Sequence, residues 1–341
     1  MQRYALLALA SALLFGAAAP ALKPITGAMH PVLLAGLLYL GSFLGLACAR
    51  SFRRTDEARL QRRDLPMLAG AIAAGGLVAP VLLVWGLSGL AASAASLLLA
   101  SEAVLTMLVA ALLFREAIAA RVWMAAVFML VAAGILAWTP GVSVPVSLHA
   151  LAVLAACLLW GFDNNLTSRI SLADPFAIAM WKGLVAGSVN TALGLALAPA
   201  VPEMRWLGAL AVGAVGYGAS LVLYVLALRH LGAARTAAHF GTAPFFGAAL
   251  AVAFLGEPVN AALGAAFVLT GAATWLALTE RHGHEHDHEA IDHEHRHVHD
   301  EHHQHAHDGD EGPEPHSHAH WHAPLRHGHA HFPDLHHRHR H

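Results

Sequence analysis

Charged residues are scarce in the first 280 positions of this 341-residue chain. That stretch has 15 Lys and Arg and 10 Asp and Glu, most of them in short clusters between long apolar runs. A soluble helix needs one charged face, and these runs have none. About 20 apolar residues match the roughly 30 Å hydrocarbon core of a bilayer at about 1.5 Å per residue. The sequence therefore predicts many membrane spans and excludes a pair of soluble domains.

Cysteine and recognisable enzyme motifs are also scarce. Cys48 and Cys157 are the two cysteines, and both lie inside apolar runs. They form no disulfide framework, and we expect both to be buried as small hydrophobic side chains. The sequence offers no phosphate-cradling glycine loop, no nucleophile with its base and no ATP-binding domain. It argues against an enzyme and gives no sign of nucleic-acid binding.

The apolar runs predict ten helices in an all-α membrane protein. Their approximate bounds are 4–22, 29–50, 65–86, 91–113, 119–138, 147–167, 175–198, 205–228, 232–254 and 259–279. The first resembles a signal peptide, with Arg3 before an apolar stretch and small residues at 17–19. Its counterpart later in the chain favours a retained helix.

That counterpart belongs to an internal repeat. Phe15-Gly16 and Trp160-Gly161, His30-Pro31 and Asp174-Pro175, and Glu116 and Glu257 are separated by 145, 144 and 141 residues. So small a drift indicates two homologous five-helix halves, residues 1–140 and 141–280, followed by a tail at 281–341. An odd number of spans per half inverts the second half in the membrane, as in many secondary transporters.

Basic residues in the short loops predict the orientation. The loop between the second and third helices is rich in arginine, and later loops of the same parity carry the remaining arginines of this set: Arg50, Arg53, Arg54, Arg59, Arg62, Arg63, Arg115, Arg121, Arg169, Arg229 and Arg235. Loops of opposite parity offer only Lys23 and Arg205. Both termini are therefore predicted to be cytoplasmic in the inner (plasma) membrane.

Residues 1–280 resemble the EamA branch of the drug/metabolite transporter superfamily. The resemblance rests on the ten spans, the duplication, Trp160-Gly161, Pro244, and a Glu after the fourth helix of each half, Glu116 and Glu257. Phe15 stands where the first half often has Trp, and Ala103 where the fourth helix often has Pro. The resemblance implies a ten-helix carrier of small organic metabolites that requires no cofactor. For Glu116 and Glu257 it implies a capping or interface role.

Glu102 is the clearest ionisable residue inside a predicted span. It lies near the middle of the helix 91–113. A charge at the bilayer centre costs roughly 2.5–3.5 kcal/mol or more, so it needs a reason. We expect a carboxylate that faces a water-filled cavity and couples protons or binds a substrate amine. The alternative is a protonated carboxyl that is hydrogen-bonded across a helix interface.

A polar cluster, Asp163-Asn164-Asn165, lies near the end of the helix 147–167, after Trp160. It either lines the substrate pathway or marks a helix end that reaches the interface early. Lys182 lies at a similar depth in the next helix, where it would pair with Asp163 or extend to the membrane surface. Surface extension is the slightly preferred alternative.

His239, in the ninth predicted helix, is followed closely by Gly241, Thr242 and Pro244. A neutral histidine there could relay protons, bind a substrate carboxylate or simply pack. Pro244 is expected to open the helix and turn carbonyls toward a cavity, as is Pro80 after Gly75-Gly76 in the third helix.

The tail, residues 281–341, holds 23 of the chain's 27 histidines. It carries many acids and few large apolar residues, so we expect disorder without metal. Imidazoles at every second position can wrap around Zn²⁺, Ni²⁺, Co²⁺ or Cu²⁺ in several weak sites. The proposed ligands are His282, His284, His286, His288, His293, His295, His297, His299, His316, His318, His320 and His322.

Three functions follow from these features. The leading one is a metabolite carrier, expected to be an exporter, with Glu102, Asp163, Asn164, His239, Trp160 and Lys182 at its substrate or coupling site. The first alternative is a divalent-metal carrier loaded by the tail, and the second is a membrane-anchored metal buffer or sensor. The expected partners are the bilayer, a small molecule and divalent metal ions, and a homodimer is left open.

Overall fold

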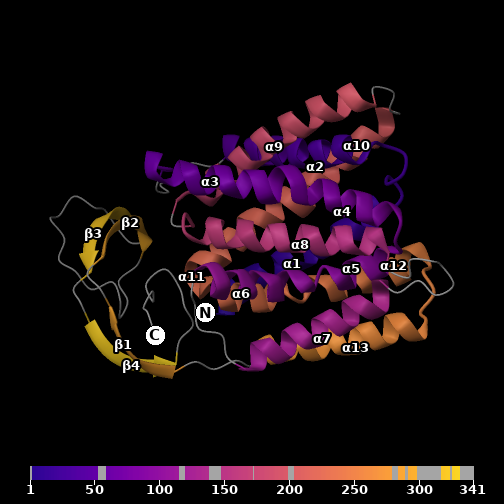
Figure 1. Ribbon diagram of the computed structural model, residues 1–341. Helices are drawn as coiled ribbons and strands as arrows, with labels where there is room; N and C mark the ends of the chain where they lie inside the picture. The colour runs from indigo at the N-terminus through magenta and orange to yellow at the C-terminus, as the bar shows by residue number, and fades with distance from the viewer. Residues whose placement is uncertain are drawn as a thin grey trace.

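The chain folds into a helical bundle followed by a histidine-rich tail. The structure, a computed structural model, describes residues 2–52, 59–114, 120–137, 147–171, 173–198 and 203–278, together with four strands in the tail. In Figure 1 the helices α2 (Pro31–Ser51) and α9 (Pro175–Leu197) lie side by side along one edge of the bundle. The helices α7 (Ala120–Ala137) and α13 (Ala261–Leu278) form the opposite edge.

Between these edges lie α1 (Gln2–Leu22) and α8 (Leu148–Ser168) (Figure 1). The remaining elements of the bundle are η1 (Arg62–Asp64), α3 (Leu65–Ala71), η2 (Ile72–Val78), α4 (Ala79–Ser88), α5 (Ala92–Leu98), α6 (Ser101–Phe114), α10 (Glu203–Val212), η3 (Gly213–Ala219), α11 (Ser220–Phe240) and α12 (Ala243–Leu255). The N-terminus lies at the end of the bundle from which the tail extends (Figure 1).

In the part of the chain that the structure describes, seven helices are long and apolar enough to cross a membrane. Three further apolar helices are shorter: Trp123–Leu136, Ala243–Leu255 and Ala261–Leu276. Many large apolar side chains are exposed on the outside of the bundle, for example Leu130 at 67% and Val268 at 69%. Such a surface is stable in lipid and not in water, so the chain is a multi-pass membrane protein.

Two long helices contain a π-helical turn. η2 joins α3 to α4, and η3 joins α10 to α11, 141 residues later. Pro80 explains the first turn, because proline has no backbone N–H. An α-helical hydrogen bond from residue 80 would go to the carbonyl of Gly76 and a π-helical one to the carbonyl of Gly75, and neither can form. The carbonyls of Gly75 and Gly76 instead accept side-chain hydrogen bonds from neighbouring helices. The expectation that Pro80 would release carbonyls is therefore confirmed.

The fourth and ninth predicted helices are each interrupted inside the bundle. α5 ends at Leu98 and α6 begins at Ser101, while α11 ends at Phe240 and α12 begins at Ala243. The two interruptions are 142 residues apart. Pro244 occupies the first turn of α12, where its missing N–H is tolerated. This position confirms that Pro244 marks an opening in the ninth helix.

Three expectations differ from the structure. Cys157 is buried, but Cys48 is exposed on α2, because one face of that helix lies on the outside of the bundle. The turn expected between residues 228 and 232 is wrong, since α11 continues through it. This stretch has no proline to stop a helix, and its Leu and Arg residues favour one.

The third difference concerns the tail, where we expected disorder. The structure describes four strands: β1 (Gly283–His288), β2 (Ile291–His297), β3 (His316–His322) and β4 (Leu325–Ala330). β1 pairs antiparallel with β4, and β2 with β3. The alternating His-x-His pattern has the two-residue period of a strand, which explains why these segments can pair.

Candidate substrate cavity

A cavity opens in the middle of the bundle between helices of both halves of the sequence. Its empty volume is about 560 Å³, the space at its mouth included. Its lining combines aromatic rings with polar and ionisable groups: Phe15, Tyr39, Ser42, Glu102, Trp160, Asp163, Asn164, Lys182, Gly216, Tyr217, Ser220, Leu221, Tyr224 and Phe240. This mixture is typical of a small-molecule site, where apolar walls give affinity and a few polar groups give orientation.

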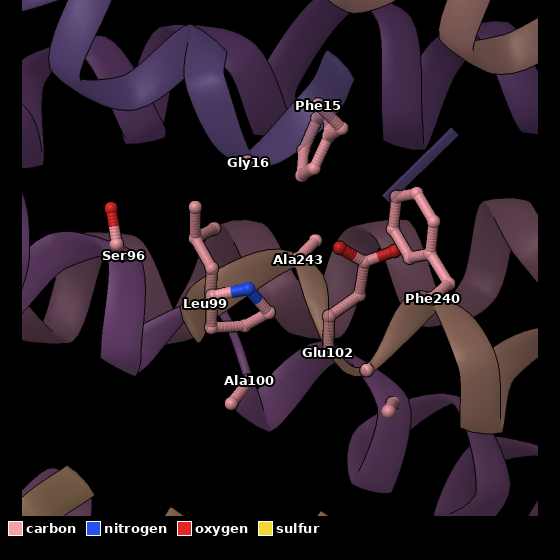
Figure 2. A pocket seen from close by; sticks show the side chains of 11 residues that line it. Phe15, Gly16, Ser96, Leu99, Ala100, Glu102, Phe240 and Ala243 are labelled. Atoms are coloured by element: carbon pink, nitrogen blue, oxygen red, sulfur yellow. The ribbon is translucent and has the colours of Figure 1, made fainter. Parts of the chain in front are cut away.

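A smaller hollow of about 330 Å³ shares Phe15, Glu102 and Phe240 with this cavity. It is lined by both helix interruptions, through Leu99 and Ala100 on one side and Gly241 and Pro244 on the other. Figure 2 shows the Glu102 carboxylate pointing into this hollow toward Phe15 and Phe240. The two interrupted helices thus meet at the carboxylate, in the arrangement that transporters use for binding at mid-membrane.

Glu102 is 8% exposed, near the start of α6. Its Oε1 accepts a hydrogen bond of 2.9 Å from Asn164 Nδ2 on α8, and the same amide donates to Thr106 Oγ1 at 3.3 Å. This bond holds the carboxylate across a helix interface, while the cavity contact keeps it open to a ligand or a proton. Glu102 thus lines the cavity and is also hydrogen-bonded across a helix interface, while its part in coupling or substrate binding stays a prediction.

Asp163 and Lys182 form a buried ion pair. Lys182 Nζ lies 2.5 Å from Asp163 Oδ1, and the two residues are 2% and 5% exposed. Thr167 Oγ1 donates to the same carboxylate oxygen at 2.8 Å and accepts from Lys182 Nζ at 3.0 Å. The preference for Lys182 extending to the membrane surface is wrong. A pair on facing helices neutralises two charges that would otherwise be costly in lipid.

The Gly75 carbonyl in η2 anchors two of the aromatic side chains. It accepts hydrogen bonds from Tyr39 Oη at 2.6 Å and from Trp160 Nε1 at 3.0 Å. A Cβ on Gly75 would lie 1.9 Å from Asp163 Oδ2. Glycine is therefore required where the π-helical turn meets the ion pair.

Phe15 lies at the centre of the aromatic group. Its ring centroid is 5.7 Å from that of Trp160, 5.8 Å from Tyr217 and 5.3 Å from Phe240. Phe15 and Trp160 are the residues that match each other in the sequence repeat, and they meet nearly edge to face at 82°. Aromatic rings in this geometry pack stably and present both faces and edges to a ligand.

Five of the six predicted site residues line the cavity: Glu102, Asp163, Asn164, Trp160 and Lys182. His239 is not in the lining, although its neighbour Phe240 is. The sequence interpretation missed Tyr39, Tyr217 and Tyr224. Three of the chain's four tyrosines lie within apolar runs, and a hydroxyl there needs a polar partner or a cavity, which could have identified them.

Glu257 caps a helix at one end of the bundle, as the family resemblance implied. Its two oxygens accept from the backbone N–H groups of Ala92 at 2.7 Å and Ser93 at 2.9 Å, at the start of α5. Burial raises the pKa of Glu257, but the hydrogen bonds from Ser93 and Ala92 and the charge of Lys23 outweigh it, so the pKa is lowered. Glu116, its counterpart, lies outside the described residues.

Lys23 lies at the same end of the bundle as Glu257. Its ammonium donates to the carbonyls of Leu87, at 2.8 Å, and Leu90. Burial lowers the pKa of Lys23, and Glu257 opposes that shift. At the other end of the bundle, Arg50 and Asp174 form an ion pair at 2.5 Å, and Arg229 donates hydrogen bonds to two carbonyls of the turn after α8.

No cluster of three or more His, Cys, Asp or Glu suited to a metal ion occurs among the residues that the structure describes. The side chains of the tail histidines, His282 to His322 among them, lie outside that description. Their metal-binding role therefore stays a prediction.

Comparison with known proteins adds the family to this site. The pattern of the EamA-like transporter family matches residues 2–138 and 147–279. The chain belongs to this family. It is a membrane transporter and not an enzyme. The two matched segments fall on the two halves of the chain that the motifs had separated.

Two individual proteins are similar. An "Uncharacterized transporter" from Methanothermobacter thermautotrophicus is 28% identical over 273 residues, which cover 72% of this chain and 77% of that protein. A solved structure described as "Crystal structure of protein" has a TM-score of 0.60 at 19% identity and covers 81% of this chain and 96% of its own. The second likeness concerns the fold alone.

Proposed function

We propose that this chain is a secondary transporter that exports small organic metabolites by alternating access, with the central cavity as its substrate site. The observation that carries the proposal is the convergence of Glu102, Asn164 and the Asp163–Lys182 pair on one aromatic-lined cavity. A mere membrane anchor would have no need of ionisable groups there, since each is costly in a span.

The proposed carrier consists of two inverted five-helix halves, residues 1–140 and 141–280, with ten spans in all. Three observations support this organisation: the π-helical turns, 141 residues apart, the helix interruptions, 142 residues apart, and the family match on each half. The cavity takes residues from both halves, so a rocking of one half against the other would expose it to each side in turn.

Both termini are proposed to lie in the cytoplasm, in the inner membrane. The N-terminus and the origin of the tail lie at the same end of the bundle (Figure 1). Arg50 and Arg229 lie near Asp174 at one end of the bundle, and Lys23 lies near Glu257 at the other end. A reporter that works only in the cytoplasm is expected to be active when it is fused after His341, and a reporter that works only in the periplasm is expected to be inactive there. A periplasmic signal would contradict both the span count and the inverted repeat.

The tail is proposed to bind divalent transition-metal ions and to buffer or sense them beside the carrier. Its alternating histidines support this role. A metal path through the membrane is the weaker hypothesis, because Glu102 is the one carboxylate of the cavity lining that is not engaged with a lysine, and a transition metal prefers three or four ligands.

Uptake into sealed vesicles tests the proposal. The purified full chain and a chain lacking 281–341 would be given a panel of labelled amino acids, amines, organic acids and divalent metals. We expect at least one organic compound to move with either chain and Glu102→Gln to reduce its flux at least about tenfold. The matched control is Glu257→Gln, outside the cavity. Flux of metals alone, or of nothing, would refute a metabolite carrier.

A further inference from the structure

The charges that face the cavity do not cancel. Lys182 and Asp163 are paired at 2.5 Å, and Thr167 accepts another of the lysine's hydrogen bonds. Glu102 receives one hydrogen bond, from the neutral Asn164, and has no cationic side chain within ion-pair distance in the described part of the chain. With Glu102 ionised, the cavity therefore carries one net negative charge.

The walls around this charge are aromatic. Phe15 and Phe240 pack against each other and face the Glu102 carboxylate (Figure 2), and Trp160 and Tyr217 stack edge to face on Phe15. Ring faces attract a cation that lies within about 6 Å of the ring centroid, most strongly where water is excluded. The same rings repel an anion, so the walls reinforce the selectivity of the carboxylate.

A buried hydroxyl in the cavity lacks a partner. Tyr217 is 7% exposed, and its Oη has no hydrogen-bond partner in the part of the chain that the structure describes. Buried hydroxyls are nearly always hydrogen-bonded in folded proteins. An oxygen in this position can accept an N–H from a ligand, as can the second oxygen of Glu102.

We propose that the cavity binds a monovalent organic cation, a small amine with an apolar or aromatic body, whose ammonium group lies between Glu102 and Tyr217. This inference rests on the proposed function and names the substrate class of that same cavity. The ammonium donates to both oxygens, and the carbon skeleton packs against Phe15, Trp160 and Phe240.

Other ligand charges fit less well. An anion would need Lys182, whose ammonium is already engaged by Asp163 and Thr167. A neutral alcohol of the same shape would leave the Glu102 charge without a counter-charge in the cavity.

Calorimetry on the purified full chain tests the inference with three probes of matched shape. These are 2-phenylethylamine, its neutral analogue 2-phenylethanol, and the anion 3-phenylpropanoate. At pH 7.5 we expect the amine to bind at least about tenfold more tightly than either of the others, because it gains charged hydrogen bonds. Glu102→Gln is expected to remove this preference, and Tyr217→Phe to weaken amine binding severalfold.

Tyr4→Phe, at the one tyrosine outside the lining, and Glu257→Gln are the controls and should bind the amine as the native chain does. Equal or tighter binding of the alcohol or the anion, no binding of the amine, or full amine binding by both cavity variants would overturn the inference. If Glu102→Gln fails to fold, the Tyr217→Phe result decides alone, since that change removes a single oxygen.

Flux of the same probes separates this inference from the carrier role. If vesicles move the alcohol or the anion, and Trp160→Phe reduces that flux, the cavity is a transport site of a different specificity. If no organic compound moves in any form, the proposed function fails as well.

Discussion

Two kinds of buried charge share one cavity, and their different partners imply different roles. The Asp163–Lys182 pair is closed on itself, with both residues buried. Glu102 is hydrogen-bonded only to a neutral amide and faces the empty space. The Asp163–Lys182 ion pair links α8 to α9. The Glu102 carboxylate, by contrast, is able to bind and release a ligand or a proton, which coupled transport requires.

Substitution of one member of the pair is expected to cost far more than substitution of both. Lys182→Met or Asp163→Asn alone should destabilise the protein by about 3–5 kcal/mol, because it leaves an uncompensated buried charge. The double variant should recover most of that loss. Thermal unfolding in detergent measures all three. A single variant as stable as the native chain would mean that Lys182 reaches the membrane surface after all.

Gly75→Ala should impair transport severely. The new Cβ would lie 1.9 Å from Asp163 Oδ2 and must displace either the ion pair or η2. Gly264→Ala, in α13, is the matched control, since its Cβ would meet nothing within 4 Å. That control should be neutral or stabilising by up to about 1 kcal/mol, as expected for Gly to Ala in a helix. Equal flux in the two variants would contradict the role of Gly75.

At the scale of elements, irregular helices and their caps position the site. The π-helical turn η2 turns the Gly75 carbonyl toward Tyr39 and Trp160. The interruption between α5 and α6 brings Glu102 to the cavity. α5 is only seven residues long, so the cap from Glu257 at its first turn matters for its place in the bundle.

Glu257→Ala should therefore lower the stability by about 1 kcal/mol, the usual loss when a helix cap is removed. The pKa of Glu257 is lowered by folding from its ordinary value of 4.5. Its contribution is thus present above that value and lost as pH falls through the lower, folded-state pKa. Thermal unfolding at pH 7 and near pH 3 measures the difference. An Ala variant as destabilised in acid as at neutral pH would refute the charged cap.

Sequence patterns predicted these elements unevenly, for physical reasons. Glu102, Asp163 and Lys182 could be found because a charge in a span is costly and rare. Phe240 could not be found, because a phenylalanine in a span has the same pattern whether it faces lipid, a helix or a cavity, whereas the hydroxyls of Tyr39 and Tyr217 need a polar partner or a cavity. Pro80 and Pro244 marked openings, whereas the interruption before Ser101 has no proline to announce it.

At the scale of the whole molecule, a membrane carrier is joined to a tail of different chemistry. The tail is expected to bind several Zn²⁺ or Ni²⁺ ions at pH 7.5 and to lose them by about pH 5.5, since binding needs neutral imidazoles with an ordinary pKa of about 6.5. Calorimetry on the full chain against the chain lacking 281–341 measures this. Equal metal uptake by the two chains would show that the tail is not the ligand.

The central claim is that the cavity opens to each side of the membrane in turn, and the accessibility of Ser42 tests it most directly. Ser42→Cys would be made in a chain carrying Cys48→Ser and Cys157→Ala, with Leu193→Cys, half exposed on the outside of α9, as the control. A membrane-impermeant thiol reagent would be applied separately to each face. We expect Ser42→Cys to react from both faces and Leu193→Cys from neither. Reaction of Ser42→Cys from one face only, or from none, would contradict alternating access through this cavity.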